Sequence, residues 1–173
     1  MEIRPLRPDD HDEVGALTVA AYLHVEPATL ETGYDAELRD VAGRSVGAEI
    51  LVAAEGDDVL GAVTYVPGPQ SPAAEFTEPD AAGIRMLAVA PGAQRRGVGE
   101  ALTLACVERA RAQGRRQVIL HSTDRMAGAH RLYLRLGFER DPGLDWEPEP
   151  GLWLRGFRLS LDDARSPAAV RPS

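Results

Sequence analysis

Gln94-Arg95-Arg96-Gly97-Val98-Gly99 is the most informative run of residues in this chain. It follows an apolar run at residues 84–89 and leads into a helical pattern over residues 100–113. A glycine turn between a strand and a helix leaves backbone N–H groups pointing outward at the positive end of the helix, where phosphate binds without a specific side chain. Because glycine lets a bulky diphosphate approach the main chain, the run predicts a ligand that carries a pyrophosphate.

Two common nucleotide-binding loops do not match these residues. A Walker-type loop requires Gly-Lys-Ser/Thr, and the chain contains no lysine. A dinucleotide-binding fingerprint requires a third glycine, and Leu102 stands in that position. The local sequence therefore argues against both classes of nucleotide site.

Two ordered motifs resemble those of a known family. Ala88-Val89-Ala90-Pro91 followed by Gln/Arg-x-x-Gly-x-Gly resembles the acetyl-CoA loop of the GNAT superfamily of N-acetyltransferases. Residues 129–138, which read Ala-His-Arg-Leu-Tyr-Leu-Arg-Leu-Gly-Phe, resemble its later motif Ala-x-x-Leu-Tyr-x-x-x-Gly-Phe. The second motif falls about one strand and one helix after the first. The resemblance covers residues 84–140 well and the rest of the chain in outline.

Periodicity and turn residues predict a single α+β domain over residues 1–161, followed by a disordered tail at 162–173. Capping-box spacing between Asp10 and Glu13 predicts the start of the first helix, and Gly114 the end of the third. The expected helices span residues 10 to about 22–24, 35–45, 98–113 and 126–136. The expected strands span residues 3–6, 49–54, 59–66, 84–89, 118–121, 138–140 and 152–159.

The resulting order, βααβββαβαββ on one mixed central sheet flanked by helices, is the GNAT arrangement. The resemblance implies that the fourth and fifth strands splay apart and that the pantetheine arm of acetyl-CoA fills the gap.

Composition narrows the class of protein. Hydrophobic residues make up 44% of the 173 residues, which is typical of one globular domain. No apolar run approaches the roughly 18 residues of a membrane helix, and we expect no signal peptide and a cytoplasmic location. The single cysteine, Cys106, is expected to be a buried structural thiol. The net charge of −8, with arginine supplying all 19 basic residues, argues against nonspecific nucleic-acid binding and mildly favours a cationic acceptor.

The resemblance implies a binding site for acetyl-CoA, the acyl donor. It implies no metal. Backbone groups of the strand would hold the pantetheine and the acetyl end, and one N–H there would polarise the thioester carbonyl. The loop N–H groups would cradle the pyrophosphate, whereas the two loop arginines either add charge near the adenosine phosphates or remain solvated. The implied cofactor-binding residues are Leu87, Ala88, Val89, Gln94, Arg95, Arg96, Gly97, Val98, Gly99, Glu100 and Ala129.

Tyr133 is the candidate catalytic residue, because it aligns with the tyrosine that frequently protonates the departing CoA thiolate in this superfamily. The alternative is a helix tyrosine that packs its ring in the core, and the two are compatible in space. Ala129 lies one turn earlier on the same face, and its small side chain would leave room for the cofactor. Met126 replaces the family's frequent asparagine, so that contact with CoA is not carried over.

The general base and the acceptor stay open. A base could come from several titratable residues, or a chain of waters could replace it, as it can in this superfamily. The candidates are Glu75, Glu78, Asp80, Glu31, Asp35, His24 and His121. The acidic loop 141–151 carries Trp146, which either holds a cationic amine or packs as a lid or as a contact in a homodimer.

We therefore expect transfer of an acetyl group to a primary amine by direct attack in a ternary complex. The acceptor is either a small molecule or a protein amine, with neither nucleic acid nor membrane as a partner. Two alternatives are a catalytically silent acetyl-CoA sensor and an enzyme that uses another acyl-CoA.

Overall fold

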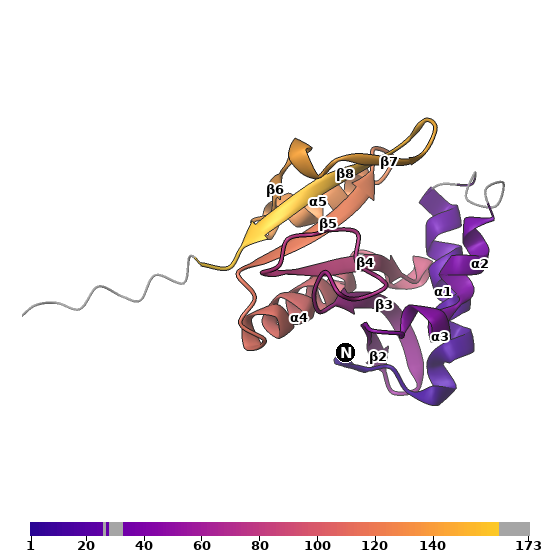
Figure 1. Ribbon diagram of the computed structural model, residues 1–173. Coiled ribbons are helices and arrows are strands. Elements are labelled where there is room, and N and C mark those ends of the chain that lie inside the picture. The colour runs from indigo at the N-terminus through magenta and orange to yellow at the C-terminus, as the bar shows by residue number, and fades with distance from the viewer. Residues whose placement is uncertain (26, 28–32, 163–173) are drawn as a thin grey trace, which may run out of the picture.

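The computed structural model of the chain describes residues 1–25, 27 and 33–162 (Figure 1). The strands are β1 (Glu2–Pro5), β2 (Glu49–Glu55), β3 (Asp58–Val66), β4 (Ala81–Val89), β5 (Gln117–Thr123), β6 (Glu139–Arg140), β7 (Trp146–Glu149) and β8 (Leu152–Ser160). The helices are α1 (His11–Val25), α2 (Tyr34–Arg39), α3 (Val41–Arg44), α4 (Val98–Ala112) and α5 (Ala127–Arg135). Three short 3₁₀ turns complete the description: η1 (Pro8–Asp10), η3 (Pro91–Ala93) and η4 (Pro142–Leu144).

One mixed sheet runs through the molecule in the order β1-β2-β3-β4-β5-β8-β6, with β7 paired to β8. All neighbouring strands are antiparallel except β4 and β5, which are parallel. Helices cover both faces of this sheet (Figure 1). The predicted fold class, an α+β domain built on one mixed sheet, is therefore confirmed.

Alternating side chains of the strands divide the core into two layers. In β2, Leu51 and Ala53 pack on the layer that holds α4 and α5, whereas Ile50 and Val52 pack on the layer that holds α1 and α3. This alternation is the period-2 pattern of a strand that is buried on both faces. Helices thus cover both faces of the sheet. A ligand can reach the middle of the sheet only where two neighbouring strands separate.

The separation occurs between β4 and β5. Their parallel pairing covers only four residue pairs, from Ala81 with Gln117 to Ile84 with Leu120. Beyond that point β4 continues to Val89 and β5 to Thr123, but the two strands no longer pair. The splayed strands that the family resemblance implied are therefore present.

Three local predictions are wrong. The single helix expected over residues 35–45 is two short helices, because Asp40 interrupts α2 and its carboxylate instead accepts the Gly43 N–H at the start of α3. Asp10 does not form a capping box with Glu13, because its carboxylate is turned toward Arg4. The loop expected over residues 141–151 contains η4 and the strand β7.

Only Asp162 of the predicted disordered tail lies in the described part, where its carboxylate is 2.8 Å from the Arg116 guanidinium. Within the described ranges, no helix combines the length and the apolar character that crossing a bilayer requires.

A buried ion pair joins the N-terminal strand to the start of the first helix. The guanidinium of Arg4 donates two hydrogen bonds, of 2.6 and 3.0 Å, to the carboxylate of Asp10, which also accepts the Arg7 N–H. Both residues are less than one-tenth exposed. The hydrogen bond from Arg4 is the largest influence on Asp10 and holds its pKa below the ordinary value, despite burial.

Asp10→Asn should lower the free energy of unfolding at neutral pH by about 2 kcal/mol, because the buried Arg4 charge loses its partner. A carboxyl whose pKa is lowered by folding stabilises the protein above its unfolded pKa, near 4, and loses that contribution as the pH falls further. Denaturant unfolding should show a large difference in the free energy of unfolding between Asp10→Asn and wild type at pH 7. Below pH 4 this difference should be smaller. The control is Asp9→Asn, at an exposed neighbour; equal effects of the two variants would contradict the role of the ion pair.

Candidate active site

The strand–loop–helix unit predicted around residues 94–99 forms as β4, η3 and α4. Gly97 is the N-cap of α4, with a φ of 79° in the left-handed region that favours glycine. No side chain in the described part of the chain caps this helix end, so its first N–H groups remain free to donate to an anion. A Cβ on Gly97 would meet no described atom within 4 Å, so open space lies beside it. The N-terminal start of α4 therefore has the geometry of an anion-binding site.

The two arginines of the loop have different surroundings. Nη2 of Arg96 lies 2.7 and 2.9 Å from the carboxylate oxygens of Glu55 at the end of β2. This exposed ion pair holds Arg96 beside β2, so its suggested contribution to phosphate binding requires the pair to open. Arg95 has a φ of 61°, unusual for a residue with a side chain, and this conformation turns the chain toward Gly97.

A bulge interrupts β4 shortly before this loop. The register with β3 shifts so that Ala62 pairs with Ala88, whereas Thr64 pairs with Arg85. Met86 lies in the bulge with a φ of 50°, which bulky side chains rarely adopt. A bulge leaves backbone N–H and C=O groups without a partner in the ladder, here directly before Leu87. The residue types do not predict this bulge, because Met86 is neither glycine nor asparagine.

The strand after the bulge meets the start of α4 and the helix α5. A Cβ placed on Gly99 would lie 3.4 Å from Leu132, 3.6 Å from Val89 and 3.9 Å from Leu87. Ala129, one of the predicted cofactor residues, packs at the edge of the same core layer. The structure thus places Leu87 and Val89 of β4 beside Gly99 of α4 and Leu132 of α5.

Tyr133 lies on α5 and is 5% exposed. Its ring packs against Phe138 and Phe157, with centroid distances of 5.8 and 5.9 Å. Burial is the main reason that the pKa of its phenol is well above the ordinary value. The hydroxyl therefore keeps its proton throughout the physiological pH range, as a proton donor must.

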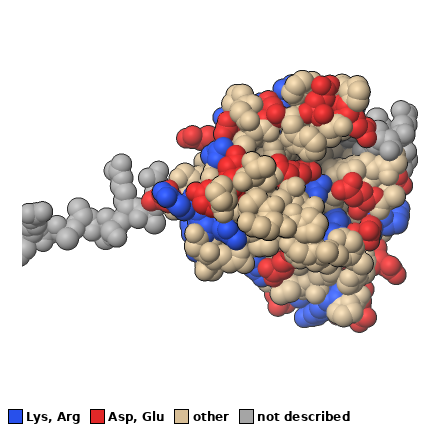
Figure 2. All heavy atoms as spheres, in the orientation of Figure 1, with Lys and Arg blue, Asp and Glu red and all other residues tan. Residues whose placement is uncertain are grey.

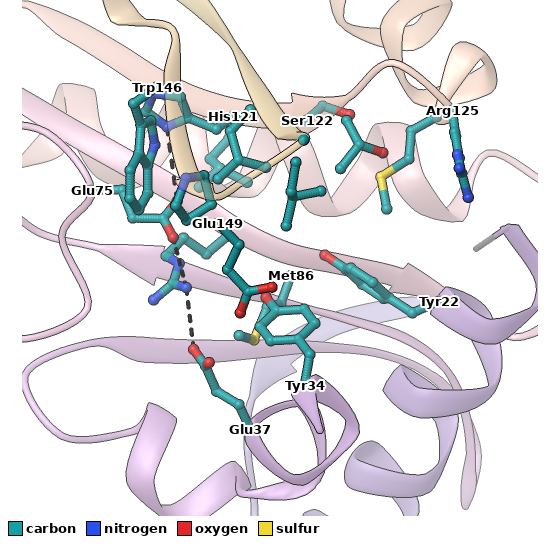
Figure 3. A pocket seen from close by; sticks show the side chains of 18 of the residues that line it. Tyr22, Tyr34, Glu37, Glu75, Met86, His121, Ser122, Arg125, Trp146 and Glu149 are labelled. Carbon is teal, nitrogen blue, oxygen red and sulfur yellow. Dashed lines mark hydrogen bonds and ion pairs between the residues drawn. The ribbon is translucent and has the colours of Figure 1, made fainter. Parts of the chain in front are cut away.

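A cavity of about 590 Å³ opens between the helices α1 and α2, the splayed strands and the β7–β8 hairpin. The phenols of Tyr22 and Tyr34 reach into it from the helices, and Trp146 and Glu149 face them from the hairpin (Figure 3). Acidic side chains gather at the tip of this hairpin on the outer surface (Figure 2). The residues that line the cavity are Tyr22, Tyr34, Glu37, Glu75, Ile84, Arg85, Met86, His121, Ser122, Thr123, Arg125, Met126, Trp146, Pro148, Glu149, Pro150, Gly151, Leu152 and Leu154.

Charged groups converge on one wall of this cavity. Arg85 of β4 lies 2.8 Å from Glu75 and 3.4 Å from Glu37. Burial opposes the charge of Arg85, but Glu75, Tyr34 and Glu37 outweigh it, so its pKa is above the ordinary value. Burial also raises the pKa of Tyr22, and the neighbouring phenols of Tyr34 and Tyr133 raise it further. Burial raises the pKa of Tyr34 to about 12 as well, so both cavity tyrosines are neutral hydrogen-bond partners at physiological pH.

His121 of β5 has a defined orientation. Its Nε2 is 2.9 Å from the carbonyl oxygen of Leu144, which can only accept, so Nε2 carries the proton. In the neutral ring, Nδ1 is then the basic nitrogen, and it lies 3.8 Å from the carboxylate of Glu75. This pair combines a proton acceptor with a nearby negative charge that would stabilise the protonated ring.

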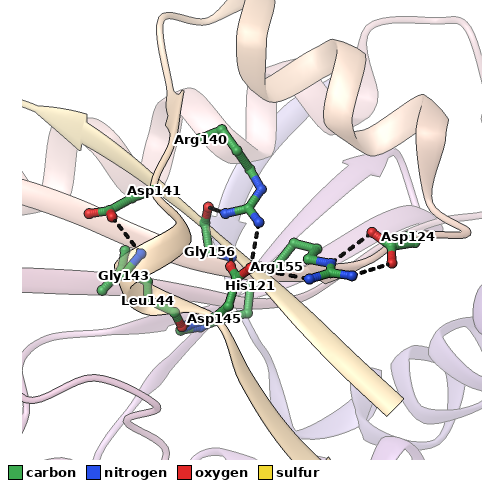
Figure 4. A network of polar contacts seen from close by, with 9 residues as sticks. All are labelled: His121, Asp124, Arg140, Asp141, Gly143, Leu144, Asp145, Arg155 and Gly156. Carbon is green, nitrogen blue, oxygen red and sulfur yellow. Dashed lines mark hydrogen bonds and ion pairs between the residues drawn. The ribbon is translucent and has the colours of Figure 1, made fainter. Parts of the chain in front are cut away.

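A polar network holds the Leu144 carbonyl in place (Figure 4). The carboxylate of Asp145 accepts the Gly156 N–H at 2.8 Å and hydrogen bonds from Arg140 and Arg155 at 2.6 and 3.3 Å. Burial raises the pKa of Asp145, but these hydrogen bonds outweigh it, and the pKa stays below the ordinary value. Any Cβ on Gly156 would overlap Leu144, so glycine allows this close packing. The turn η4, which the network holds against β8, therefore sets the orientation of His121.

Of the candidate bases named from the sequence, only Glu75 and His121 line this cavity among the described residues. Among the described residues, four of them are absent from the lining of this cavity, namely Glu78, Asp80, His24 and Asp35. Glu31 lies outside the described residues. Sequence reasoning did not single out Arg85, Tyr22 or Tyr34, whose only signal is their position on elements that flank the splayed strands.

Comparison with known proteins gives a consistent family. The sequence profile described as Acetyltransferase (GNAT) family matches residues 16–138. A crystal structure from Desulfovibrio desulfuricans, described as of the GNAT family, has 26% identity and a TM-score of 0.70, with 92% of this chain and 98% of that chain covered. None of the curated proteins matches the chain.

Two further solved structures share the fold. A Salmonella typhimurium protein solved with its cofactor acetyl-CoA has 22% identity and a TM-score of 0.64, with 98% of each chain covered. A ribosomal-protein-alanine N-acetyltransferase from Brucella melitensis has 21% identity and a TM-score of 0.64, with 93% of this chain and 100% of that chain covered. At these identities the likeness concerns the fold.

Proposed function

This chain belongs to the GNAT family of acetyltransferases, and from that premise we propose that it transfers an acetyl group from acetyl-CoA to the primary amine of a small molecule. The observation that carries the proposal is the uncapped start of α4 at Gly97, which lies just after the bulged end of β4. It supplies N–H donors for the diphosphate of the donor substrate. The Salmonella typhimurium relative is described with acetyl-CoA, which supports the same donor here.

The bulge at Met86 supports an assignment for the thioester. The acetyl end of the donor would lie along Leu87, Ala88 and Val89, where a backbone N–H freed by the bulge donates to the carbonyl oxygen. That hydrogen bond strengthens as the carbonyl carbon becomes tetrahedral and negative charge collects on its oxygen. The diphosphate at the loop and the acetyl group at the bulge thus fix the two ends of the pantetheine arm.

His121 and Glu75 are the residues that we assign to proton removal. An alkylamine has a pKa of about 10 and arrives mostly protonated, so it must lose a proton before it attacks. Nδ1 of His121 accepts this proton directly or through one water, and the carboxylate of Glu75, 3.8 Å away, stabilises the imidazolium. The neutral amine nitrogen then bonds to the thioester carbon, the carbon–sulfur bond breaks, and the nitrogen releases its second proton to water, which leaves a neutral amide.

Tyr133 is assigned to protonation of the departing thiolate of CoA. Its phenol is buried on α5 and keeps its proton, because burial raises its pKa. The reaction is a direct attack in a ternary complex, in which the acyl group passes from sulfur to nitrogen without a covalent enzyme intermediate.

The acceptor cavity supports a small molecule over a protein chain. Its volume of about 590 Å³ lies in the range of pockets for small molecules. Trp146 and Glu149 of the β7–β8 hairpin close it on one side, and the aromatic rings of Tyr22 and Tyr34 on another (Figure 3). Carboxylates and aromatic faces both favour a cationic amine as the ligand.

Release of CoA with a panel of amines tests this function. A thiol reagent reports free CoA only, because Cys106 is fully buried and burial raises the pKa of its thiol. The panel should include monoamines, diamines, amino acids and a peptide with a free N-terminus. Turnover with small amines supports the proposal. Binding of acetyl-CoA without turnover on any amine indicates a sensor, and turnover with the peptide alone indicates a protein substrate.

Tyr133→Phe should lower kcat by at least about tenfold while the dissociation constant of acetyl-CoA stays unchanged, because only the hydroxyl group is lost and the ring stays in place. Calorimetry gives the affinity, and CoA release gives kcat. Tyr65→Phe, which removes a hydroxyl hydrogen-bonded to Gln113 rather than one on α5, is the matched control. If Tyr133→Phe retained the full kcat, the proton-donor assignment would be wrong.

A further inference from the structure

The guanidinium of Arg85 links two carboxylates in the wall of the acceptor cavity (Figure 3). Its Nη2 lies 2.8 Å from Oε1 of Glu75 and 3.4 Å from Oε1 of Glu37. Its Nη1 donates a hydrogen bond of 3.3 Å to the carbonyl oxygen of Ala73. These contacts come from α2 and from the loop before β4, and together they fix the position of the guanidinium.

The carboxylate of Glu75 is shared between Arg85 and His121. Its Oε1 makes the 2.8 Å contact with Arg85, whereas its Oε2 lies 3.8 Å from Nδ1 of His121. The longer distance is outside hydrogen-bonding range, so the carboxylate does not hold a proton on the ring. The side chains of Arg85, Glu75 and His121 are 19%, 21% and 4% exposed, so water and salt screen their charges only in part.

Other charged groups near His121 are compensated or lie farther from its ring. Asp145, beside the Leu144 carbonyl, pairs with Arg140 and Arg155, and Arg155 also pairs with Asp124. That network therefore contains two carboxylates and two arginines. The remaining titratable groups that line the cavity are Tyr22, Tyr34, Arg125 and Glu149. Among the described residues, only Glu75 lies within ion-pair distance of the ring.

Glu75 and Arg85 have opposite effects on a base. A carboxylate beside an imidazole favours the protonated ring, and a ring that is already protonated cannot take a proton from the amine. The guanidinium opposes this effect, because it has the opposite charge and holds the carboxylate short of the ring. Although burial opposes its own charge, Glu75 helps to keep the pKa of Arg85 above the ordinary value, so Arg85 stays charged.

We propose that Arg85 is a positioning residue that keeps His121 able to act as the base. By holding the carboxylate of Glu75, it prevents a direct ion pair between that carboxylate and the ring, and it leaves the lone pair of Nδ1 for the proton of the acceptor amine. Glu75 still stabilises the imidazolium once the proton has been transferred. The inference rests on the proposed role of His121, and its first test measures the ring itself rather than turnover.

An NMR titration of the histidine rings, in the full chain without acetyl-CoA, tests this effect. The chain has four histidines, and the signal of His121 is the one missing from His121→Gln. In Arg85→Gln the midpoint of the His121 titration should move to higher pH by about one unit or more, because Glu75 is then free to pair with the ring. Arg85→Lys keeps the charge and should return the midpoint most of the way to that of wild type. A midpoint that stays in place or moves to lower pH in Arg85→Gln would overturn the proposal.

Arg109→Gln is the matched control. Arg109 pairs with Glu49 at 2.7 and 2.9 Å, and neither is among the described residues that line the acceptor cavity. This variant breaks another arginine–glutamate pair and should leave the His121 midpoint unchanged, so an equal shift in both variants would count against a local effect of Arg85.

Glu75→Gln keeps the test valid if Arg85→Gln does not fold. It removes the carboxylate and leaves the charge of Arg85 near the ring, so the His121 midpoint should move to lower pH. An unchanged midpoint in this variant would show that the pair has no influence on the ring and would contradict the proposal.

The pH dependence of kcat/KM separates this inference from the proposed function. If His121 is the base, the acid limb of the profile of Arg85→Gln should move to higher pH by the same amount as the titration of the ring. Agreement between the two shifts supports both the role of Arg85 and that of His121. A ring titration that moves while the acid limb stays in place would support the effect of Arg85 and contradict the assignment of His121 as the base.

Discussion

Gly97→Glu should weaken the binding of acetyl-CoA by at least about a hundredfold, because a carboxylate would face the diphosphate at the uncapped start of α4. The new side chain has room, since a Cβ at this position meets no described atom within 4 Å. Its φ of 79° adds a conformational cost of about 1–2 kcal/mol to folding. The fold should therefore persist while the anion site is lost, and calorimetry with acetyl-CoA measures the loss.

The chain contains a close control at the other end of the same helix. Gly114 has a φ of 70°, and a Cβ there also meets no described atom within 4 Å. Gly114→Glu thus carries the same backbone strain and the same added charge, but it places the carboxylate at the negative end of α4. It should cost similar stability and leave the affinity for acetyl-CoA unchanged. Loss of affinity in both variants, or in neither, would show that the loop does not hold the diphosphate.

The parts of this site that were predictable from sequence depend on local chemistry. A strand, two glycines and a helix within residues 84–113 specify a turn and an exposed helix end without help from the rest of the chain. The C-terminal end of α4 was predictable for the same reason, because Gly114 takes the left-handed conformation that terminates a helix. The loop at residues 94–99 and most of the helices and strands are of this kind.

The parts that could not be predicted depend on contacts between distant segments. Glu75, His121 and Leu144 come from three separate elements, and only the folded sheet brings them within hydrogen-bonding range or close to it. The bulge at Met86 is imposed by the register with β3, against the preference of its own residue type. The strand β7 was hidden by its two glutamates and its proline, which are typical of loops.

This dependence links the β7–β8 hairpin and the turn before it to the proposed site. Leu144 lies on the turn before β7, and the network around Asp145 holds that turn against β8 (Figure 4). The same hairpin carries Trp146 and Glu149 into the acceptor cavity. One segment thus both lines the large cavity and determines which ring nitrogen of His121 carries the proton.

His121→Gln should lower kcat by about a hundredfold or more at neutral pH, because general-base catalysis contributes roughly that factor. The glutamine amide can still donate to the Leu144 carbonyl in place of Nε2, but it offers no basic nitrogen toward Glu75. Acetyl-CoA affinity should be unchanged, since His121 is not among the residues assigned to the donor. Steady-state kinetics with the best amine of the panel, together with calorimetry, separate these two quantities.

The pH dependence distinguishes a base from a residue that only shapes the cavity. As the pH approaches the amine pKa of about 10, more of the acceptor arrives neutral and needs no proton acceptor, so the deficit of His121→Gln should shrink. Glu75→Gln should show a smaller deficit with the same trend, because it leaves the basic nitrogen of His121 in place and removes the charge beside it, together with the ion pair to Arg85. A loss of kcat in His121→Gln that stays constant from neutral to alkaline pH would assign His121 to structure and leave proton removal to water.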